Sequence, residues 1–135
     1  FVGRHDFVNF VHKEDRKKMD TADGSDHVID LFEFKVETKS ETEEDDPSLP
    51  LVMNATFTLN AKGFHRQMIR NLVGFVVDAA RGERSVDDVS VLLLEKQLAD
   101  VDSSGSSIDL ASTVNAAPAC GLCLANVEYE HSNFL

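Results

Sequence analysis

The sequence lacks most of the features that identify a function directly. It contains no apolar run of about 18 residues or more, the length that a membrane-spanning helix requires, and no signal peptide is recognisable. The phosphate-loop, dinucleotide-binding and serine-nucleophile patterns GxxxxGK(S/T), GxGxxG and GxSxG do not occur. We therefore expect no membrane span, and the commonest nucleotide-binding enzymes and hydrolases are disfavoured.

Cysteine is scarce as well. Cys120 and Cys123 are the two cysteines of the chain, too few for a disulfide framework, which suits a reducing compartment. Their CxxC spacing is a weak metal signal, because there is no second CxxC and no nearby histidine pair. On a strand, residues three positions apart also face opposite sides. We predict structural or incidental cysteines and no metal site.

Positive charge is scarce over the chain as a whole. Lys and Arg number 13 against 24 Asp and Glu, so the formal net charge is −11. This balance disfavours nonspecific nucleic-acid binding by the whole surface. Residues 62–84 have the opposite charge balance, with five Lys or Arg and two Asp or Glu. A local basic site is therefore compatible with an acidic protein.

The hydrophobic pattern predicts one α+β domain with a sizeable core, since 42% of the 135 residues are hydrophobic. We expect segment 3–11 to bury Phe7 and Phe10. Period-two patterns predict strands at 27–39 and 51–61, joined as an antiparallel pair. In the first strand, the expected faces are Val28, Asp30, Phe32, Phe34 and Val36 against Ile29, Leu31, Glu33, Lys35 and Glu37, with one face mostly buried.

In the second half of the chain, the spacing of apolar residues changes from that of a strand to that of a helix. Apolar residues at helical spacing predict an amphipathic helix over 64–80, with Gly82 as its C-terminal cap glycine. Ser85 resembles the N-cap of a second helix that ends near Gln97, and 121–129 is predicted to be a last strand. The order of elements indicates an antiparallel β-sheet with two helices packed on one face.

Three polar stretches are expected to be mobile loops or insertions. Residues 12–26 are mixed in charge, residues 40–50 are acidic and contain proline, and residues 99–119 are rich in serine. Such compositions cannot bury enough apolar surface to order a segment.

Arg66 and Arg70 form the basic cluster at the start of the predicted helix. Together with Asn71 and Gly74 they occupy one polar stripe of that helix. The residues alone leave two interpretations open. The stripe is either a solvated helix face or an anion site, where backbone N–H groups and guanidinium groups at a helix N-terminus favour phosphate or carboxylate.

Three blocks of the sequence resemble the TruA-type tRNA pseudouridine synthases. "GRHDFVNF" (3–10) resembles the G-x-H-D-F-x-x-F segment of that family, and "GFHRQMIRNLVG" (63–74) resembles its G-F-L-H-H-M-V-R-N-I-V-G helix. "AAPACGLCLANVEY" (116–129) resembles its closing A-P-x-x-G-L-x-L-x-x-V-x-Y. The blocks occur in the family's order and extend over nearly the whole chain.

The resemblance implies the pseudouridine synthase fold and isomerisation of uridine to pseudouridine in tRNA, without cofactor or metal. Arg70 matches the basic residue of the M-V-R-N segment, which in the family pairs with the catalytic aspartate. The resemblance therefore makes Arg70 the candidate catalytic residue. Candidate RNA-binding residues are Lys62, His65, Arg66, Gln67 and Asn71. An intracellular location, in the nucleus or the cytoplasm, and tRNA as partner follow from the same resemblance, while a homodimer is left open.

The chain also departs from the family pattern. The R-T-D-x-G-V motif with the nucleophilic aspartate does not occur, and neither does the tyrosine that follows it in the family. We therefore expect residues 1–135 to be the C-terminal half of such an enzyme, inactive alone. His65, Arg66 and Gln67 replace the usual Leu and two His, and Cys123 replaces the usual Tyr. The alternatives are a non-catalytic RNA-binding or protein-interaction module derived from the family, and a plain acidic scaffold domain.

Overall fold

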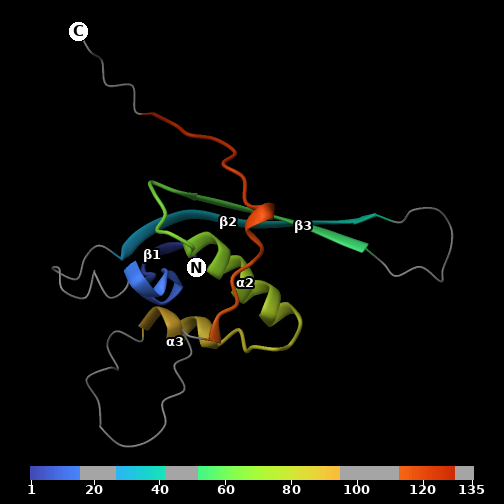
Figure 1. Ribbon diagram of the computed structural model, residues 1–135, viewed down its shortest axis with the longest axis horizontal. Helices are drawn as coiled ribbons and strands as arrows, with labels where there is room; N and C mark the ends of the chain where they lie inside the picture. Colours follow the sequence, from blue (N-terminus) through green and yellow to red (C-terminus); the bar gives the residue numbers. More distant parts are fainter. Residues whose placement is uncertain (16–26, 42–51, 95–112, 130–135) are drawn as a thin grey trace, which may run out of the picture.

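The computed structural model describes residues 1–15, 27–41, 52–94 and 113–129 (Figure 1). Its elements, in chain order, are β1 (Gly3–Asp6), η1 (Val8–Phe10), β2 (Val28–Glu41), β3 (Val52–Ala61), α2 (Met68–Ala80), α3 (Asp88–Leu94) and η4 (Ala119–Gly121). Most of the three expected loops, and the expected end of the second helix beyond Leu94, lie outside the described residues.

The three described strands form one antiparallel sheet in the order β1-β2-β3. β2 and β3 form a long hairpin in which Glu41 pairs with Val52 at the far end and Leu31 with Ala61 at the near end. The antiparallel pair expected from the two period-two patterns is confirmed. β1 adds to the near end of β2 alone, since its four residues pair with Val28 to Leu31.

The prediction that one regular face of this strand is mostly buried is wrong, because the side chains of β2 change sides at a bulge. The pairing register shifts between Leu31 and Glu33, and an extra residue in one strand moves the following side chains to the opposite side. Leu31 is therefore buried, Phe32 is 54% exposed, and Phe34 packs against the core although it is three positions from Leu31. Beyond the bulge, Phe34 and Val36 share the apolar face.

Both helices lie on one face of the sheet, in agreement with the expected α+β architecture (Figure 1). Phe7 and Phe10 are fully buried, as predicted, and their side chains anchor the short η1 turn in the core. The core cluster contains side chains from the sheet, the η1 region and both helices. Its members are Phe7, Phe10, Leu31, Met68, Leu72, Phe75 and Leu92. Nearly complete burial of such side chains contributes about 1.5–3 kcal/mol each, so this cluster fixes α2 against the sheet.

Helix α2 begins later than its apolar pattern predicted. Gln67 precedes it with a left-handed backbone (φ 63°), so the helical backbone cannot extend back to Phe64. At the other end, the amide of Gly82 donates to Ala79 O (3.0 Å) and that of Glu83 donates to Asp78 O (2.9 Å). With Gly82 at φ 76°, this is a Schellman cap. The predicted cap glycine is confirmed.

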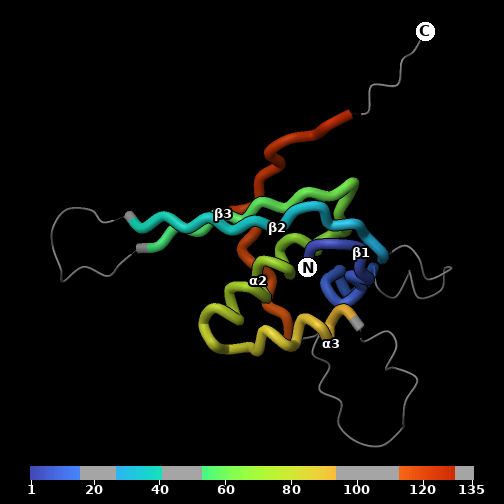
Figure 2. Tube along the Cα trace, turned by 180° about the vertical axis from the view of Figure 1, so that it is seen from behind, coloured from blue at the N-terminus to red at the C-terminus, as the bar shows by residue number. Residues whose placement is uncertain are grey.

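The predicted last strand at 121–129 is not a strand in the structure. After η4, residues 122–129 have no regular secondary structure, and all are exposed, with Leu124 at 80% and Tyr129 at 81%. Both ribbon and tube views show this segment running out past the hairpin (Figures 1 and 2). A strand requires a neighbour to receive its hydrogen bonds, and none of the described strands pairs with this segment. No helix among the described residues is long and apolar enough to cross a membrane.

Candidate functional site

The basic cluster lies where the chain leaves β3 and enters α2. β3 ends at Ala61, residues 62–67 form the connection, and Arg70 occupies the first turn of the helix. Met68 N donates to His65 O (3.1 Å), which closes a turn at the end of the connection. Asn71 N donates to Gln67 O (2.9 Å), which begins the hydrogen bonds of α2. The site is therefore built on a strand end and a helix start that are both tied to the core.

Arg70 is half-buried and is held by the backbone of a distant segment. Its Nε donates to the carbonyl of Ala117 (2.7 Å), and the amide of Ala117 donates to the carbonyl of Arg70 (2.9 Å). Within the described residues, the two terminal nitrogens of the guanidinium make no hydrogen bond or ion pair. Those nitrogens form a planar two-donor edge that matches a carboxylate or phosphate.

The partner segment of Arg70 crosses α2, and we call residues 113–118 the crossing segment. Figures 1 and 2 show it passing along α2 before it reaches the hairpin. Gly74 is buried beneath it, and Asn115 Nδ2 donates to the buried carboxylate of Asp78 (3.1 Å). This side of α2 is thus covered by the chain itself, so the alternative of a solvated helix face does not hold at Gly74.

The side chain of Asn71 is buried in the interior of the molecule. It is 9% exposed, and its Nδ2 donates to the carbonyl of Phe10 (2.7 Å). A similar bond joins Asn9 Nδ2 to Leu92 O (2.7 Å). Both bonds satisfy carbonyls at helix or turn ends that would otherwise be unpaired. In the described chain, Asn71 connects α2 to the buried η1 turn.

The other candidate RNA-binding residues lie outside this interior. Lys62 and Arg66 are exposed, while His65 and Gln67 are half-buried. Arg66 Nη1 lies 3.9 Å from Glu14 Oε2, and both side chains are largely solvated, so the pair contributes little. The rings of His65 and the fully buried His27 lie 6.2 Å apart.

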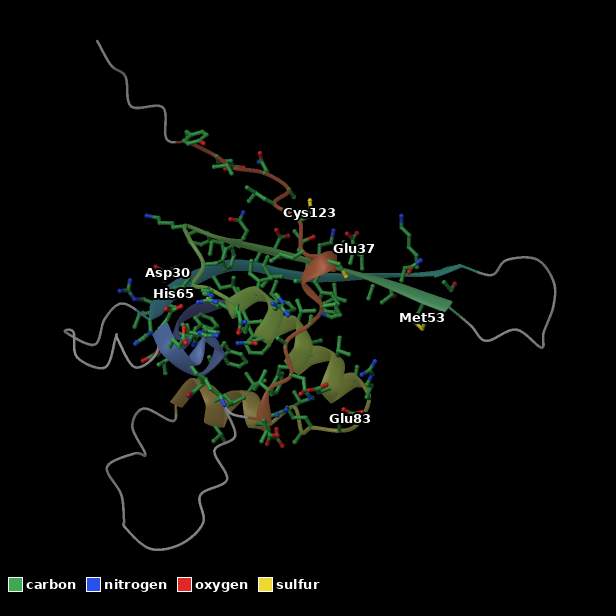
Figure 3. All side chains as sticks on the ribbon, in the orientation of Figure 1. Asp30, Glu37, Met53, His65, Glu83 and Cys123 are labelled. Carbon is green, nitrogen blue, oxygen red and sulfur yellow. The ribbon has the colours of Figure 1, made fainter. Side chains whose placement is uncertain are left out.

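An open hollow adjoins this connection, with an accessible volume of about 430 Å³. It lies between the near end of β2 and the β3–α2 connection, where Figure 3 labels Asp30 and His65 close together. Its lining consists of Val28, Ile29, Asp30, Lys62, Gly63, Phe64 and His65. The hollow therefore offers an aromatic ring, an imidazole and an ammonium group on one side.

The His-Asp pair of the GRHDFVNF block has structural partners, and the two cysteines have no ligand geometry in the described part of the chain. His5 Nε2 lies 3.1 Å from Val2 O, and Asp6 Oδ1 accepts the amide of Val8 (3.0 Å) at the start of η1. Cys120 and Cys123 are exposed free thiols. No group of three or more His, Cys, Asp or Glu side chains with metal-binding spacing occurs in the described part of the chain.

The crossing segment is the part of the site that the sequence pattern did not identify. Residues 113–118 fall within the serine-rich stretch 99–119 that we expected to be a mobile loop. The available signal was Gly74, a glycine in the middle of a helical pattern, which usually has a packing reason. What approaches such a glycine is decided by tertiary structure and cannot be obtained from spacing.

Comparison with known proteins identifies the family of the chain. The family model described as tRNA pseudouridine synthase matches residues 1–130. Curated relatives include tRNA pseudouridine synthase A of Finegoldia magna, 32% identical over 95% of this chain and 40% of its own length. That of Solidesulfovibrio magneticus is 30% identical over 96% of this chain and 36% of its own length.

The chain therefore spans less than half of the length of these two curated relatives, 40% and 36% respectively. No solved structure gave a significant match. The match to the family model extends across β1, the β2–β3 hairpin, helices α2 and α3, and residues 122–129, which we call the C-terminal segment. The chain belongs to the TruA-type tRNA pseudouridine synthase family.

Proposed function

We propose that this chain is the C-terminal part of an enzyme that isomerises uridine to pseudouridine in tRNA. Arg70 is the residue that carries the proposal. In this mechanism its terminal nitrogens bind the catalytic carboxylate, which comes from a part of the protein outside these 135 residues. An arginine beside a partly buried carboxylate keeps that group ionised and oriented toward the nucleoside.

The geometry of Arg70 supports this role. The guanidinium is anchored through Nε on Ala117 O, and the two-donor edge that remains fits one carboxylate. Because the group is half-buried, its attraction to a carboxylate is screened less than that of an exposed arginine. Anchoring also removes part of the side chain's rotational freedom before the carboxylate binds.

The tRNA is proposed to contact the β3–α2 connection. Lys62 and Arg66 supply positive charge for phosphates, and His65 lines the hollow beside the connection. Gln67 belongs to the same connection, and Asn71 supports it from the interior through its bond to Phe10 O. The target uridine must leave its base stack to reach an active site. If tRNA is the substrate, we expect the protein inside the cell, where tRNA is modified.

The deciding experiment is pseudouridine formation on bulk tRNA by the full-length protein that contains this chain. We expect activity from the parent protein and none from residues 1–135 alone. Arg70→Ala should lower turnover at least about a hundredfold, the scale of one electrostatic contact in an active site. It should also cost about 1 kcal/mol of stability, because the bond to Ala117 O is lost.

Arg81→Ala is the matched control, since Arg81 is an exposed arginine at the other end of α2. It should leave turnover unchanged. Near-normal turnover of Arg70→Ala would remove Arg70 from the mechanism. A full-length protein that binds tRNA but forms no pseudouridine would favour the alternative, a non-catalytic RNA-binding module of the family.

A further inference from the structure

We propose that Gly74 and Asn115 are positioning residues for Arg70. They seat the crossing segment on α2 so that the carbonyl of Ala117 holds the guanidinium at Nε and its terminal nitrogens face the catalytic carboxylate. This inference rests on the proposed function and names the residues that give Arg70 its orientation.

The first step is the double connection between residues 70 and 117. Arg70 Nε donates to Ala117 O (2.7 Å), and Ala117 N donates to Arg70 O (2.9 Å). The second bond fixes the backbone of residue 117 beside the first turn of α2, and the first bond then fixes the guanidinium. The orientation of Arg70 therefore depends on where the crossing segment lies.

The second step is the close approach at Gly74, one helical turn further along the same side of α2. A Cβ atom at this position would overlap with Asn115 O and would lie 3.1 Å from Ala117 N. Both atoms are backbone, so no side-chain rotation relieves the overlap. Glycine inside a helix costs about 0.5–1 kcal/mol relative to alanine, and here it leaves the space that the crossing segment occupies.

The third step is a bond one turn further on. Asn115 Nδ2 donates to Asp78 Oδ2 (3.1 Å), and Asp78 is 6% exposed. Arg84 Nη2 donates to Thr113 Oγ1 (2.6 Å) at the start of the segment. Contacts at Arg70, Gly74 and Asp78 thus follow three successive turns of α2 and set the register of the segment along the helix.

The test uses the full-length protein and two readouts. The first is the NMR signal of the Arg70 Nε–H group, which should exchange slowly with water because it is bonded to Ala117 O. The second is turnover against KM on tRNA. In Gly74→Ala, the added methyl must displace residues 115–117. We expect the Nε–H signal to shift and exchange faster, and kcat to fall about tenfold or more, with KM changed less than about threefold.

A second pair of variants serves if Gly74→Ala does not fold. Asn115→Asp places two carboxylates where the bond to Asp78 was and should produce the same changes. Adding Asp78→Asn restores one donor and one acceptor, so the double variant should regain most of the turnover and the slow Nε–H exchange. Gly121→Ala is the control, because no atom lies within 4 Å of a Cβ at that position and Gly121 lies outside the crossing segment and the β3–α2 connection. All variants are compared at a temperature at which circular dichroism shows them folded.

The results separate the two proposals. If the parent protein forms no pseudouridine, the proposed function fails, and the Nε–H signal alone decides the positioning role. If folded Gly74→Ala or Asn115→Asp keeps the Nε–H signal and kcat of the parent, the positioning role is wrong. A loss of stability with unchanged kcat and an unchanged Nε–H signal also overturns it, because that result describes packing alone.

Discussion

At the scale of single residues, the two arginines of the basic cluster, Arg66 and Arg70, have different environments. Arg70 is half-buried and anchored through Nε, which suits a group that must present its charge in one direction. Arg66 precedes the helix, and its side chain is 63% exposed, with Glu14 as a distant partner. An exposed, weakly paired arginine suits contact with phosphate, which requires charge more than a fixed orientation.

We predict that Arg66→Ala weakens tRNA binding by the full-length protein in a salt-dependent way. Loss of one phosphate contact should lower the slope of log K against log salt by about 0.7–0.9. Fluorescence anisotropy with labelled tRNA at several salt concentrations measures this slope, and kcat at saturating tRNA should change little. Lys39→Ala on the exposed β2–β3 hairpin is the control. An unchanged slope for Arg66→Ala would show that Arg66 does not contact phosphate.

Residue identity allowed part of the structure around the candidate site to be predicted, while the roles of the site residues stay predictions. The position of Arg70 follows from its motif, and the burial of Phe7 and Phe10 follows from their apolar spacing. The interior bond of Asn71 does not, because an asparagine on a polar stripe serves solvent, RNA or a buried carbonyl equally well in sequence. The contact at Gly74 likewise depends on a segment 41 positions away, Asn115.

At the scale of elements, boundaries follow local backbone chemistry more closely than hydrophobic pattern. Phe64 continues the apolar spacing of α2, yet the left-handed Gln67 delays the helix to Met68. The bulge after Leu31 changes the buried face of β2 without a sequence signal, because a bulge is a property of pairing. Segment 121–129 has the composition of a strand, but composition does not supply the neighbour that a strand needs.

The C-terminal cap of α2 yields a prediction with a close control. Gly82 has φ 76°, and no atom lies within 4 Å of the position that a Cβ would occupy, so Gly82→Ala tests backbone conformation alone. We expect it to lower the free energy of unfolding by about 1 kcal/mol. Gly63→Ala, which is equally uncrowded and has no positive φ, should change it by less than about 0.5 kcal/mol. Urea unfolding followed by circular dichroism measures both, and equal effects would contradict the cap.

At the scale of the whole molecule, the described chain leaves apolar surface uncovered. Val36 and Met53 are 45% and 60% exposed on the side of the hairpin that also carries Phe34. Figure 3 shows Met53 near the far end of the hairpin, away from the helices. The C-terminal segment adds Leu122, Leu124 and Val127. Exposed apolar surface of this extent usually meets a partner.

We therefore predict that the purified 135-residue chain self-associates in a concentration-dependent way. Sedimentation velocity should show larger species as concentration rises. Val36→Thr combined with Met53→Thr should weaken the association about tenfold, which corresponds to ~1.4 kcal/mol. Thr58→Ser, on the polar side of the same hairpin, should leave it unchanged. A chain that stays monomeric at all concentrations contradicts the prediction.

The exposure of Tyr129 has a spectroscopic consequence. The chain contains no tryptophan and one tyrosine, and that tyrosine is 81% exposed on the C-terminal segment, outside the core. Tyrosine fluorescence of this chain is therefore insensitive to unfolding of the core and reports on the environment of residue 129. A change in emission per molecule as the concentration of this chain rises therefore identifies contact of this segment with a second copy, without any label.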